Sequence, residues 1–386
     1  MVDQSRLSST ISWLIAGAQP PKTIDLIVEE CAKRLINVGI PIDALIIDGI
    51  YIHPQIRAIR TSWTKKKGST RQTFTRDIFE ASTFASTGIA ICMNSKRAVR
   101  YRFDDNEADT PSDFRQNYQN AGFTDVLLLP LFNFDGTVTG CVEVGTRTND
   151  GFTEEQITAL RRMQAPIARM KEYFTERFDK QITLATYVGE ETSKKVLNGK
   201  IVLGDGETIS AVIMFADITG FTALSNSSRS EDVLKVLNHF YGAIDAAVSR
   251  NNGEILKFMG DGVLVIFPTP DDLTAQEAAA SGAIDSVALA RKQLAQDDAG
   301  PALEFRASLH IGEVFFGNIG SGNRLDFTAI GPGVNLASRM LDEASNRGAQ
   351  TVCSNAFRQI ALGISTKPVT CDFKGFDDPV EIYLLD

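Results

Sequence analysis

Two aspartates in the second half of the chain each come at the end of an apolar run, close to glycine. Asp217 closes the run AVIMFAD, and Asp261 lies 44 residues further on, in a Gly-Asp-Gly turn between LKFM and VLVIF. Carboxylate oxygens are the ligands that Mg²⁺ and Mn²⁺ prefer, and two carboxylates could hold a pair of such ions. Each aspartate alone is a weak indication, because Asp and Gly are common in turns for backbone reasons.

A second pair of polar residues could act together on a substrate. Asn335 and Arg339 are four positions apart, so a helix would present both side chains on one face. The histidines His53, His239 and His310 are isolated in the sequence. We therefore expect them to be structural or surface residues rather than metal ligands.

The elements that must position these residues alternate between strand and helix from about residue 185 to the end. The apolar runs before Asp217 and on both sides of Asp261 are typical of strands. Residues 231–248 carry an apolar stripe at helical spacing, which is typical of a core helix or of a dimer surface. The spacing alone does not separate these two interpretations. We expect a catalytic domain over residues 189–386.

The first half of the chain indicates a separate domain that mixes helices and strands. Residues 1–22 indicate an N-terminal helix that stops at two prolines, which oppose its continuation. Helical spacing and then a strand pattern follow over 23–52. Two β-rich runs over 125–147 flank an Asp-Gly pair, which favours a hairpin turn. The predicted fold class is therefore α/β and α+β, with the first domain over 23–153.

Residues 154–188 predict a long helix between the two domains. Apolar residues recur in it at alternating spacings of three and four, the pattern of a coiled-coil seam that would dimerise and carry a signal. The seam spans only about two heptads and includes a proline, so a helix that packs on its own domain is the alternative. The seam residues are Leu160, Met163, Ile167, Met170 and Phe174.

Length and composition limit the classes of function. A chain of 386 residues favours two domains, and a formal net charge of −9 argues against nucleic acid as a partner. Its five cysteines are scattered and never form a CxxC pair, which is typical of reduced thiols in the cytoplasm. No apolar run approaches the roughly 20 residues of a membrane helix, so we expect no membrane insertion.

Across about residues 200–386, the chain resembles the catalytic domain of class III nucleotide cyclases. The segment FADITGFT looks like the first metal motif of that family, and KFMGDG looks like the second. The segment FTAIGPGVNLASRM over 327–340 is similar to the third signature, and Thr328 within it matches the variant called class IIIb. The resemblance implies a ferredoxin-like βααββαβ domain that converts ATP to 3′,5′-cyclic AMP and pyrophosphate.

The resemblance also implies a two-metal mechanism. Two Mg²⁺ or Mn²⁺ ions per active site would be held by Asp217, Asp261 and the backbone carbonyl of Ile218. Asn335 would hold the ribose in line for attack, and Arg339 would stabilise the charge that grows on the phosphates. In this family the site forms between two subunits, so a homodimer with shared sites is implied.

Four further residues fall on positions that bind the nucleotide in this family. Lys257 stands in the place of the purine-reading residue, where adenylyl cyclases carry Lys and guanylyl cyclases carry Glu. Thr328 would contact the N6 region of adenine. Lys374, in the segment FKGF, matches a triphosphate-binding lysine, and Arg324 would be another phosphate contact.

The N-terminal half looks like a GAF domain, a small-ligand sensor often fused to cyclases. The similarity lies in the segment DVLLLPLFNFDGTVTGCVEV and the following GFTEEQ. It implies an unidentified small ligand or signal that regulates the catalytic domain.

Two alternative functions stay open from the sequence. A guanylyl cyclase is opposed by Lys257 and Thr328, which suit adenine. A catalytically silent cyclase-like module, acting as a binding or dimerisation partner, would usually lack a metal-binding or transition-state residue. All of those residues are present in this chain.

Overall fold

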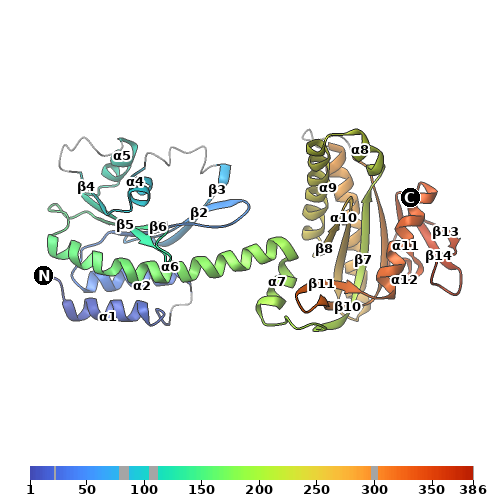
Figure 1. Ribbon diagram of the computed structural model, residues 1–386, viewed down its shortest axis with the longest axis horizontal. Helices are drawn as coiled ribbons and strands as arrows, with labels where there is room; N and C mark the ends of the chain where they lie inside the picture. Colours follow the sequence, from blue (N-terminus) through green and yellow to red (C-terminus); the bar gives the residue numbers. More distant parts are fainter. Residues whose placement is uncertain (21–22, 78–86, 104–111, 297–302, 386) are drawn as a thin grey trace. The chain divides into compact units, whose positions relative to one another are not determined.

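A computed structural model describes most of the chain, and the chain divides into two compact units, residues 1–183 and 184–386 (Figure 1). Within the described part, no helix is both long enough and apolar enough to cross a membrane. The described residues are 1–20, 23–77, 87–103, 112–296 and 303–385.

The described residues of the N-terminal unit contain an antiparallel six-stranded sheet in the order β3-β2-β1-β6-β5-β4. The predicted hairpin is confirmed, because β5 pairs with β6 and the connecting turn includes the Asp-Gly pair. The strands are β1 (Ala44–Ile50), β2 (Ile56–Thr64), β3 (Gly68–Thr75), β4 (Val99–Arg102), β5 (Asp125–Phe132) and β6 (Val138–Thr146).

Helices cover both faces of this sheet (Figure 1). The first two helices begin where a side chain caps free backbone N–H groups: Asp3 accepts from the N–H groups of Ser5 and Arg6, and Thr23 accepts from that of Leu26. On one face lie α1 (Gln4–Ile15), α2 (Ile24–Asn37) and α6 (Glu154–Val188), and on the other lie α4 (Gly88–Ser95) and α5 (Ser112–Asn120).

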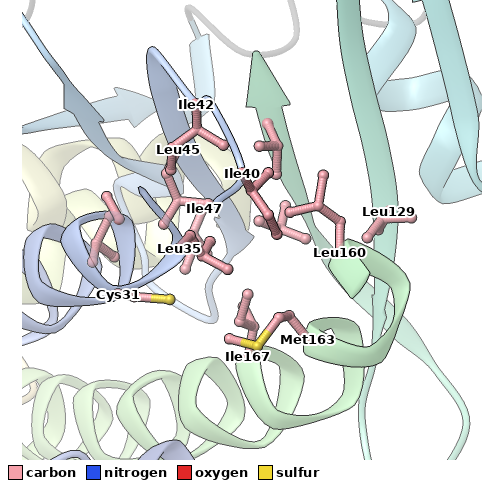
Figure 2. Packing of buried hydrophobic residues seen from close by; sticks show 14 of the residues in the cluster. Cys31, Leu35, Ile40, Ile42, Leu45, Ile47, Leu129, Leu160, Met163 and Ile167 are labelled. Atoms are coloured by element: carbon pink, nitrogen blue, oxygen red, sulfur yellow. The ribbon is translucent and has the colours of Figure 1, made fainter. Parts of the chain in front are cut away.

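The seam of α6 packs inside the N-terminal unit, and the interpretation as a dimerising seam is therefore wrong for these residues. Leu160, Met163 and Ile167 are buried among residues of α2 and of the sheet (Figure 2). Met170 is also buried in this cluster, and Phe174 packs against it. A side chain that is already removed from water in its own domain is not available to a partner helix, so the alternative interpretation holds.

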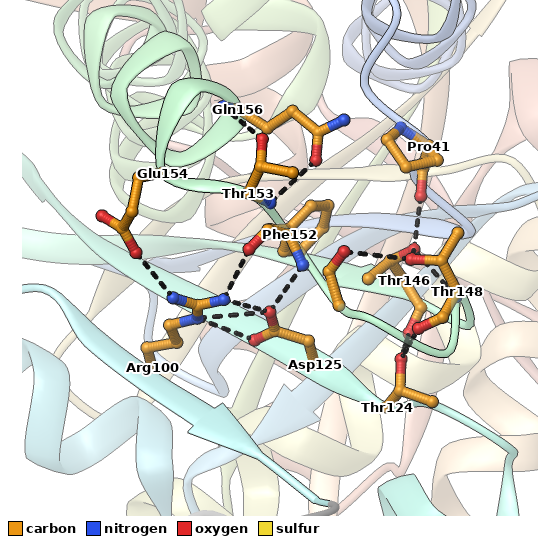
Figure 3. Close-up of polar contacts among 11 residues, drawn as sticks. Pro41, Arg100, Thr124, Asp125, Thr146, Thr148, Phe152, Thr153, Glu154 and Gln156 are labelled. Atoms are coloured by element: carbon orange, nitrogen blue, oxygen red, sulfur yellow. Dashed lines mark hydrogen bonds and ion pairs between the residues drawn. The ribbon is translucent and has the colours of Figure 1, made fainter. Parts of the chain in front are cut away.

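A buried ion pair fixes the start of α6 to the sheet (Figure 3). The Asp125 carboxylate is 0% exposed, lies 2.7 Å from the Arg100 guanidinium and accepts from the backbone N–H of Phe152 at 2.8 Å. Arg100 also donates to the Phe152 carbonyl and pairs with Glu154 in the first turn of α6. The hydrogen bonds offset the cost of burying these charges, because every charged group has a partner.

A second polar cluster lies under α5, on the opposite face of the sheet. Glu143 is 1% exposed and accepts a hydrogen bond from the Tyr118 hydroxyl. Nearby, Arg60 forms a bidentate ion pair with Asp48. The second carboxylate oxygen of Glu143 has no hydrogen-bond partner within the described part of the chain. Burial raises the pKa of Glu143 to about 7, although the charge of Arg60 opposes the shift.

The C-terminal unit contains a sheet in the order β13-β14-β12-β10-β7-β9-β8, with β11 paired to β10. Helices α9 and α10 cover one face, and α11 covers the other. The strands are β7 (Gly206–Ile218), β8 (Glu254–Met259), β9 (Gly262–Thr269), β10 (Phe305–Ser321), β11 (Arg324–Ile330), β12 (Thr351–Ser354), β13 (Thr366–Cys371) and β14 (Val380–Leu385). The helices are α7 (Glu190–Leu197), α8 (Phe221–Ser227), α9 (Ser230–Arg250), α10 (Leu273–Gln296), α11 (Pro332–Arg347) and α12 (Asn355–Ile360).

From β7 to β10 the elements follow the order βααββαβ, which is the order implied by the resemblance. The helix expected over 231–248 is confirmed as α9. Its apolar stripe packs into the core at Ile244 and Val248, which are buried, whereas Leu234 near the start of the helix is 57% exposed.

Two of the three histidines hold structural positions. The His53 Nδ1 accepts from the backbone N–H groups of Gln55 and Ile56. His310 lies 2.8 Å from the Ser354 hydroxyl, and burial lowers its pKa to about 4.

We predict that Glu143 makes the stability of the N-terminal unit depend on pH. Because its pKa rises from the ordinary 4.5 to about 7 in the fold, the folded state binds more protons between these values. Stability should therefore be highest below about pH 4.5 and should fall as pH rises to about 7. Relative to Glu143→Gln, the wild-type free energy of unfolding should fall by roughly 1 to 3 kcal/mol across this window.

Denaturant titrations from pH 4 to 8 measure this difference. The matched control is Glu155→Gln, at an exposed position of α6, which should track the wild type at every pH. Parallel curves for wild type and Glu143→Gln would show that Glu143 keeps an ordinary pKa in the fold.

Candidate active site

Strand β7 brings Asp217 to the edge of a hydrophobic core. Its residues Ala211 to Ala216 are buried between β9 and β10, and Asp217 is half-buried at the end of this run. In the sheet register, Asp217 lies between Gly262 of β9 and Arg306 of β10. A central strand paired on both sides is rigid, so it holds the carboxylate in one place.

Asp261 lies in the tight turn between β8 and β9. Gly260 adopts a φ of +72°, which glycine tolerates best, and a Cβ at Gly262 would lie only 3.2 Å from the Ala216 carbonyl. The two glycines therefore allow the turn to approach β7 closely. The Ile218 N–H donates to the Asp261 carbonyl at 3.2 Å, and the Tyr241 hydroxyl donates to the Gly260 carbonyl.

The two carboxylates lie close enough to influence each other. Burial and then the negative charge of Asp261 raise the pKa of Asp217 to about 6, while the charge of Arg306 opposes the shift. Two like charges in a partly desolvated place repel each other, and a divalent cation between them would relieve this repulsion. The described residues contain no group of three or more His, Cys, Asp or Glu side chains placed to hold a metal. The donor set at Asp217, Asp261 and the Ile218 backbone is all oxygen, which suits Mg²⁺ or Mn²⁺.

Lys257 and Thr328 come from two different strands, and the ion-pair partner of Lys257 lies on the strand that carries Thr328. Lys257 of β8 pairs with Asp326 of β11, and both side chains are 44% exposed. Asp326 and Thr328 are two positions apart on β11, so their side chains lie on the same face of the strand. Thr328 is 5% exposed and sits opposite Gly317 of β10. The ion pair therefore links Lys257 of β8 to Asp326, on the strand that also carries Thr328.

Asn335 and Arg339 lie on one exposed face of α11, as the four-residue spacing predicts. Gly331 is the N-cap of the helix and Pro332 is its first residue. The face of α11 opposite to Asn335 and Arg339 packs on the sheet through Ala337. Arg339 has a weak contact with Asp342, 3.9 Å away. Both side chains are thus free to reach a ligand.

Lys374 and Arg324 are exposed at two other places of the C-terminal unit. Lys374 lies in the connection between β13 and β14, and Arg324 is the first residue of β11. Across the residues that the structure describes, no hydrogen bond or ion pair joins either side chain, or Asn335 or Arg339, to the two aspartates. One copy of the chain therefore brings together the two aspartates, and separately Lys257 with Asp326 of β11.

Arg306 and Asp326 were not among the candidates from the sequence. Arg306 is a lone basic residue in the apolar run of β10, and only the pairing of β10 with β7 places it opposite Asp217. Asp326 precedes the third signature by one residue, and only the approach of β11 to β8 brings it to Lys257. Charged residues inside or beside apolar runs are the signal that could have singled them out.

The chain matches a known family over residues 206–367, the adenylate and guanylate cyclase catalytic domain. This stretch includes both aspartates, Lys257, Thr328, Asn335 and Arg339, and lies within the C-terminal unit. The C-terminal unit therefore contains a class III nucleotide cyclase catalytic domain.

Two curated relatives come from Mycobacterium tuberculosis (strain ATCC 25618 / H37Rv). The uncharacterized protein Rv1319c is 30% identical over 198 residues, which cover 51% of this chain and 36% of that protein. The uncharacterized protein Rv1320c is 28% identical over 232 residues, which cover 58% of this chain and 39% of that protein. The match spans between a third and two fifths of the length of these relatives.

Similar solved structures include cyclases of both nucleotide types. The adenylyl cyclase CyaB from P. aeruginosa is 30% identical, with 47% of this chain and 95% of that chain covered and a TM-score of 0.41. The guanylyl cyclase Cya2 is 28% identical, with 47% and 93% covered and a TM-score of 0.41.

We predict that Asp217→Asn and Asp261→Asn each weaken Mn²⁺ binding at least about 10-fold, because each removes a charged ligand. Electron paramagnetic resonance of free Mn²⁺ measures the affinity without any turnover. Asp245→Asn, on the exposed side of α9, is the matched control and should bind like the wild type. Unchanged affinity in both aspartate variants, with wild-type melting curves, would refute the metal assignment.

Proposed function

We propose that the chain is a class IIIb adenylyl cyclase, which converts ATP to 3′,5′-cyclic AMP and pyrophosphate. The observation that carries the proposal is the placement of Asp217 and Asp261 side by side within the stretch that matches the cyclase domain. Lys257, which pairs with Asp326 on the strand that carries Thr328, supports adenine as the base.

In this reaction the ribose 3′-oxygen forms a bond to the α-phosphorus and loses its proton. The bond between the α-phosphorus and the bridging oxygen breaks, and pyrophosphate leaves. Two Mg²⁺ or Mn²⁺ ions, bound by Asp217, Asp261 and the Ile218 carbonyl, would lower the pKa of the hydroxyl and stabilise the leaving oxygens. Asn335 would align the ribose, and Arg339 would bind the charge that grows on the phosphates.

Additional cations would bind the triphosphate. Lys374 and Arg324 are exposed, so they can reach the β- and γ-phosphates of a bound nucleotide. Arg306 is fixed opposite Asp217 in the sheet and would add positive charge next to the metal-binding carboxylates. A triphosphate carries several negative charges, and a water-poor site strengthens each such contact.

The adenine edge would be read by a donor and a hydroxyl. The Lys257 ammonium can donate to adenine N1, and the Thr328 hydroxyl can accept from the N6 amino group. Asp326 would hold the ammonium in place, because the ion pair with Lys257 restricts a long side chain. Guanine presents an N1–H donor in the same position, so it would leave the lysine without an acceptor there.

The complete site would form between two copies of the chain. Asn335 and Arg339 are exposed on α11 and make no bond to the aspartates of their own chain among the described residues. A C₂ homodimer would bring these groups of one copy to the aspartates of the other, and its symmetry would build two equivalent sites.

The N-terminal unit would act as a GAF-like sensor that regulates the cyclase of a cytoplasmic protein. An antiparallel sheet between two layers of helices offers an interior that could enclose a small ligand. The residues of α6 continue without a break from this unit to Val188. The helix could therefore transmit a change in the N-terminal unit along its own length.

The function is tested by incubating the purified chain with ATP or GTP, and with Mg²⁺ or Mn²⁺, and identifying the products by mass spectrometry. We expect cyclic AMP and pyrophosphate from ATP, with kcat/KM for GTP at least about 10-fold lower, because one mispaired buried hydrogen bond costs about 1 to 3 kcal/mol. The variant Lys257→Glu with Thr328→Cys should lower this ATP preference.

The matched control for the base is Lys292→Glu, on the exposed side of α10, which should keep the preference for ATP. Cyclic GMP as the main product would indicate a guanylyl cyclase. Nucleotide binding without any product, with the metal bound, would indicate a silent module.

We predict that two inactive variants restore each other when mixed. Asp217→Asn and Asn335→Ala remove groups that the dimer would supply from different copies, so a mixed dimer has one intact site and one doubly altered site. With random exchange, activity should approach roughly a quarter of wild type per total chain. Absence of rescue, when mass spectrometry of tagged chains shows exchange, would exclude the shared site.

A further inference from the structure

A cavity of about 870 Å³ lies in the N-terminal unit, away from the polar cluster at Glu143. One wall is the stretch of α6 from Arg169 to Gln181. The end of α1 and the start of α2 form further walls. Tyr51, which follows β1, and Arg71 of β3 complete the described lining. Its volume is in the range of small-molecule sites in proteins, about 300 to 1,000 Å³. The cavity therefore has room for a ligand of metabolite size.

The charged residues among the described lining of this cavity are all basic: Arg71, Arg169 and Arg177. Two carboxylates outside the lining, Asp179 and Asp25, lie close enough to Tyr51 to contribute to the rise of its pKa, which burial causes first. Arg169 pairs with Glu172 at 2.6 Å, which neutralises part of its charge. Arg177 donates to the Tyr173 hydroxyl at 3.3 Å, and the Arg71 guanidinium lies 5.7 Å from the centre of the Phe178 ring. Two cations thus face a hydroxyl and an aromatic ring, so both can take an anionic partner.

The rest of the lining is apolar and partly aromatic. Tyr51 is 5% exposed, and its ring meets that of Phe178 edge to face at 5.3 Å. Leu14, Ile24 and Met170 add aliphatic surface. Burial of a flat apolar group against such a surface is favourable by about 25 cal/mol for each Å² removed from water. The cavity therefore combines an apolar interior with guanidinium groups that recognise an anion.

We propose that this cavity is a binding site for an organic anion, which has a flat apolar body and one carboxylate, sulfonate or phosphate group. Arg71 and Arg177 bind the anionic group, and the rings of Tyr51, Phe174 and Phe178 contact the body. The site lies on the face of the sheet that is covered by α1, α2 and α6, so it is separate from the α4 and α5 face. Binding here does not depend on cyclase activity. Only an effect on turnover, through α6, would rest on the proposed function.

The test compares two fluorescent probes on the full chain. The first is 1-anilinonaphthalene-8-sulfonate, and the second is N-phenyl-1-naphthylamine, which has the same aromatic body without the sulfonate. Both probes brighten in apolar surroundings. The double variant Arg71→Gln with Arg177→Gln should weaken the sulfonate at least about 10-fold, because charge-assisted hydrogen bonds are lost. The neutral probe should change by less than about twofold.

Two control variants separate charge from shape. Arg161→Gln removes an exposed arginine of the same helix outside the cavity and should leave both probes unchanged. Phe178→Ala removes part of the apolar wall and should weaken both probes. If the double arginine variant does not fold, the salt dependence of the wild type decides, because salt screens the sulfonate and not the neutral probe.

Three results would overturn the proposal. One is equal loss of both probes in the double arginine variant with a wild-type melting curve, and another is no loss of either probe. The third is sulfonate binding that disappears when the protein concentration is raised through a dimerisation measured by sedimentation. In that case a second copy of the chain fills the cavity.

Discussion

The C-terminal unit depends on one unfavourable arrangement, two like charges held side by side at the end of a buried strand. This arrangement disfavours the charged form of Asp217, because burial and then the charge of Asp261 raise the pKa of this carboxyl to about 6. The fold does not relieve this repulsion by separating the two carboxylates. Strand β7 is paired on both sides, and the Ile218 N–H is bound to the Asp261 carbonyl. In the proposed cyclase, a divalent cation bound between these carboxylates would relieve the repulsion at positions that the sheet already fixes.

The positions of the two aspartates could be predicted because the cause is local. An apolar run that ends in one carboxylate and a Gly-Asp-Gly turn both leave a clear signal in the sequence. Arg306 and Asp326 could not be predicted in the same way, because their roles depend on register. A shift of one residue between β7 and β10 would turn Arg306 to the other face of the sheet. That register is fixed by the packing of the whole unit and leaves no short motif.

In two places of the N-terminal unit, the local sequence pattern fits two structural interpretations equally well, and burial in the fold decides between them. The spacing from Leu160 to Phe174 suits a coiled coil and a domain core alike, and the large apolar face of the sheet takes these side chains. Strand β6 alternates in a way that would place Glu143 in water on a one-sided sheet. Helices cover both faces, so this carboxyl is buried with the Tyr118 hydroxyl as its partner. The number of layers in a domain is a global property that a strand pattern does not encode.

Burial also bears on how the proposed active site would be completed, and it favours a second copy of the chain over a movement of α11 within one copy. Asn335 and Arg339 lie on the side of α11 that is opposite to Ala337, and the buried face of that helix packs against β7 and β10. A rotation of α11 to turn them inward would expose Ala337 and Met340, and burial of a methionine side chain alone is worth about 1.5 to 3 kcal/mol. The proposed pairing of two copies would leave both cores intact. It would also bring the exposed arginine of one copy toward the pair of like-charged carboxylates of the other, so that the charges of the two surfaces would be complementary.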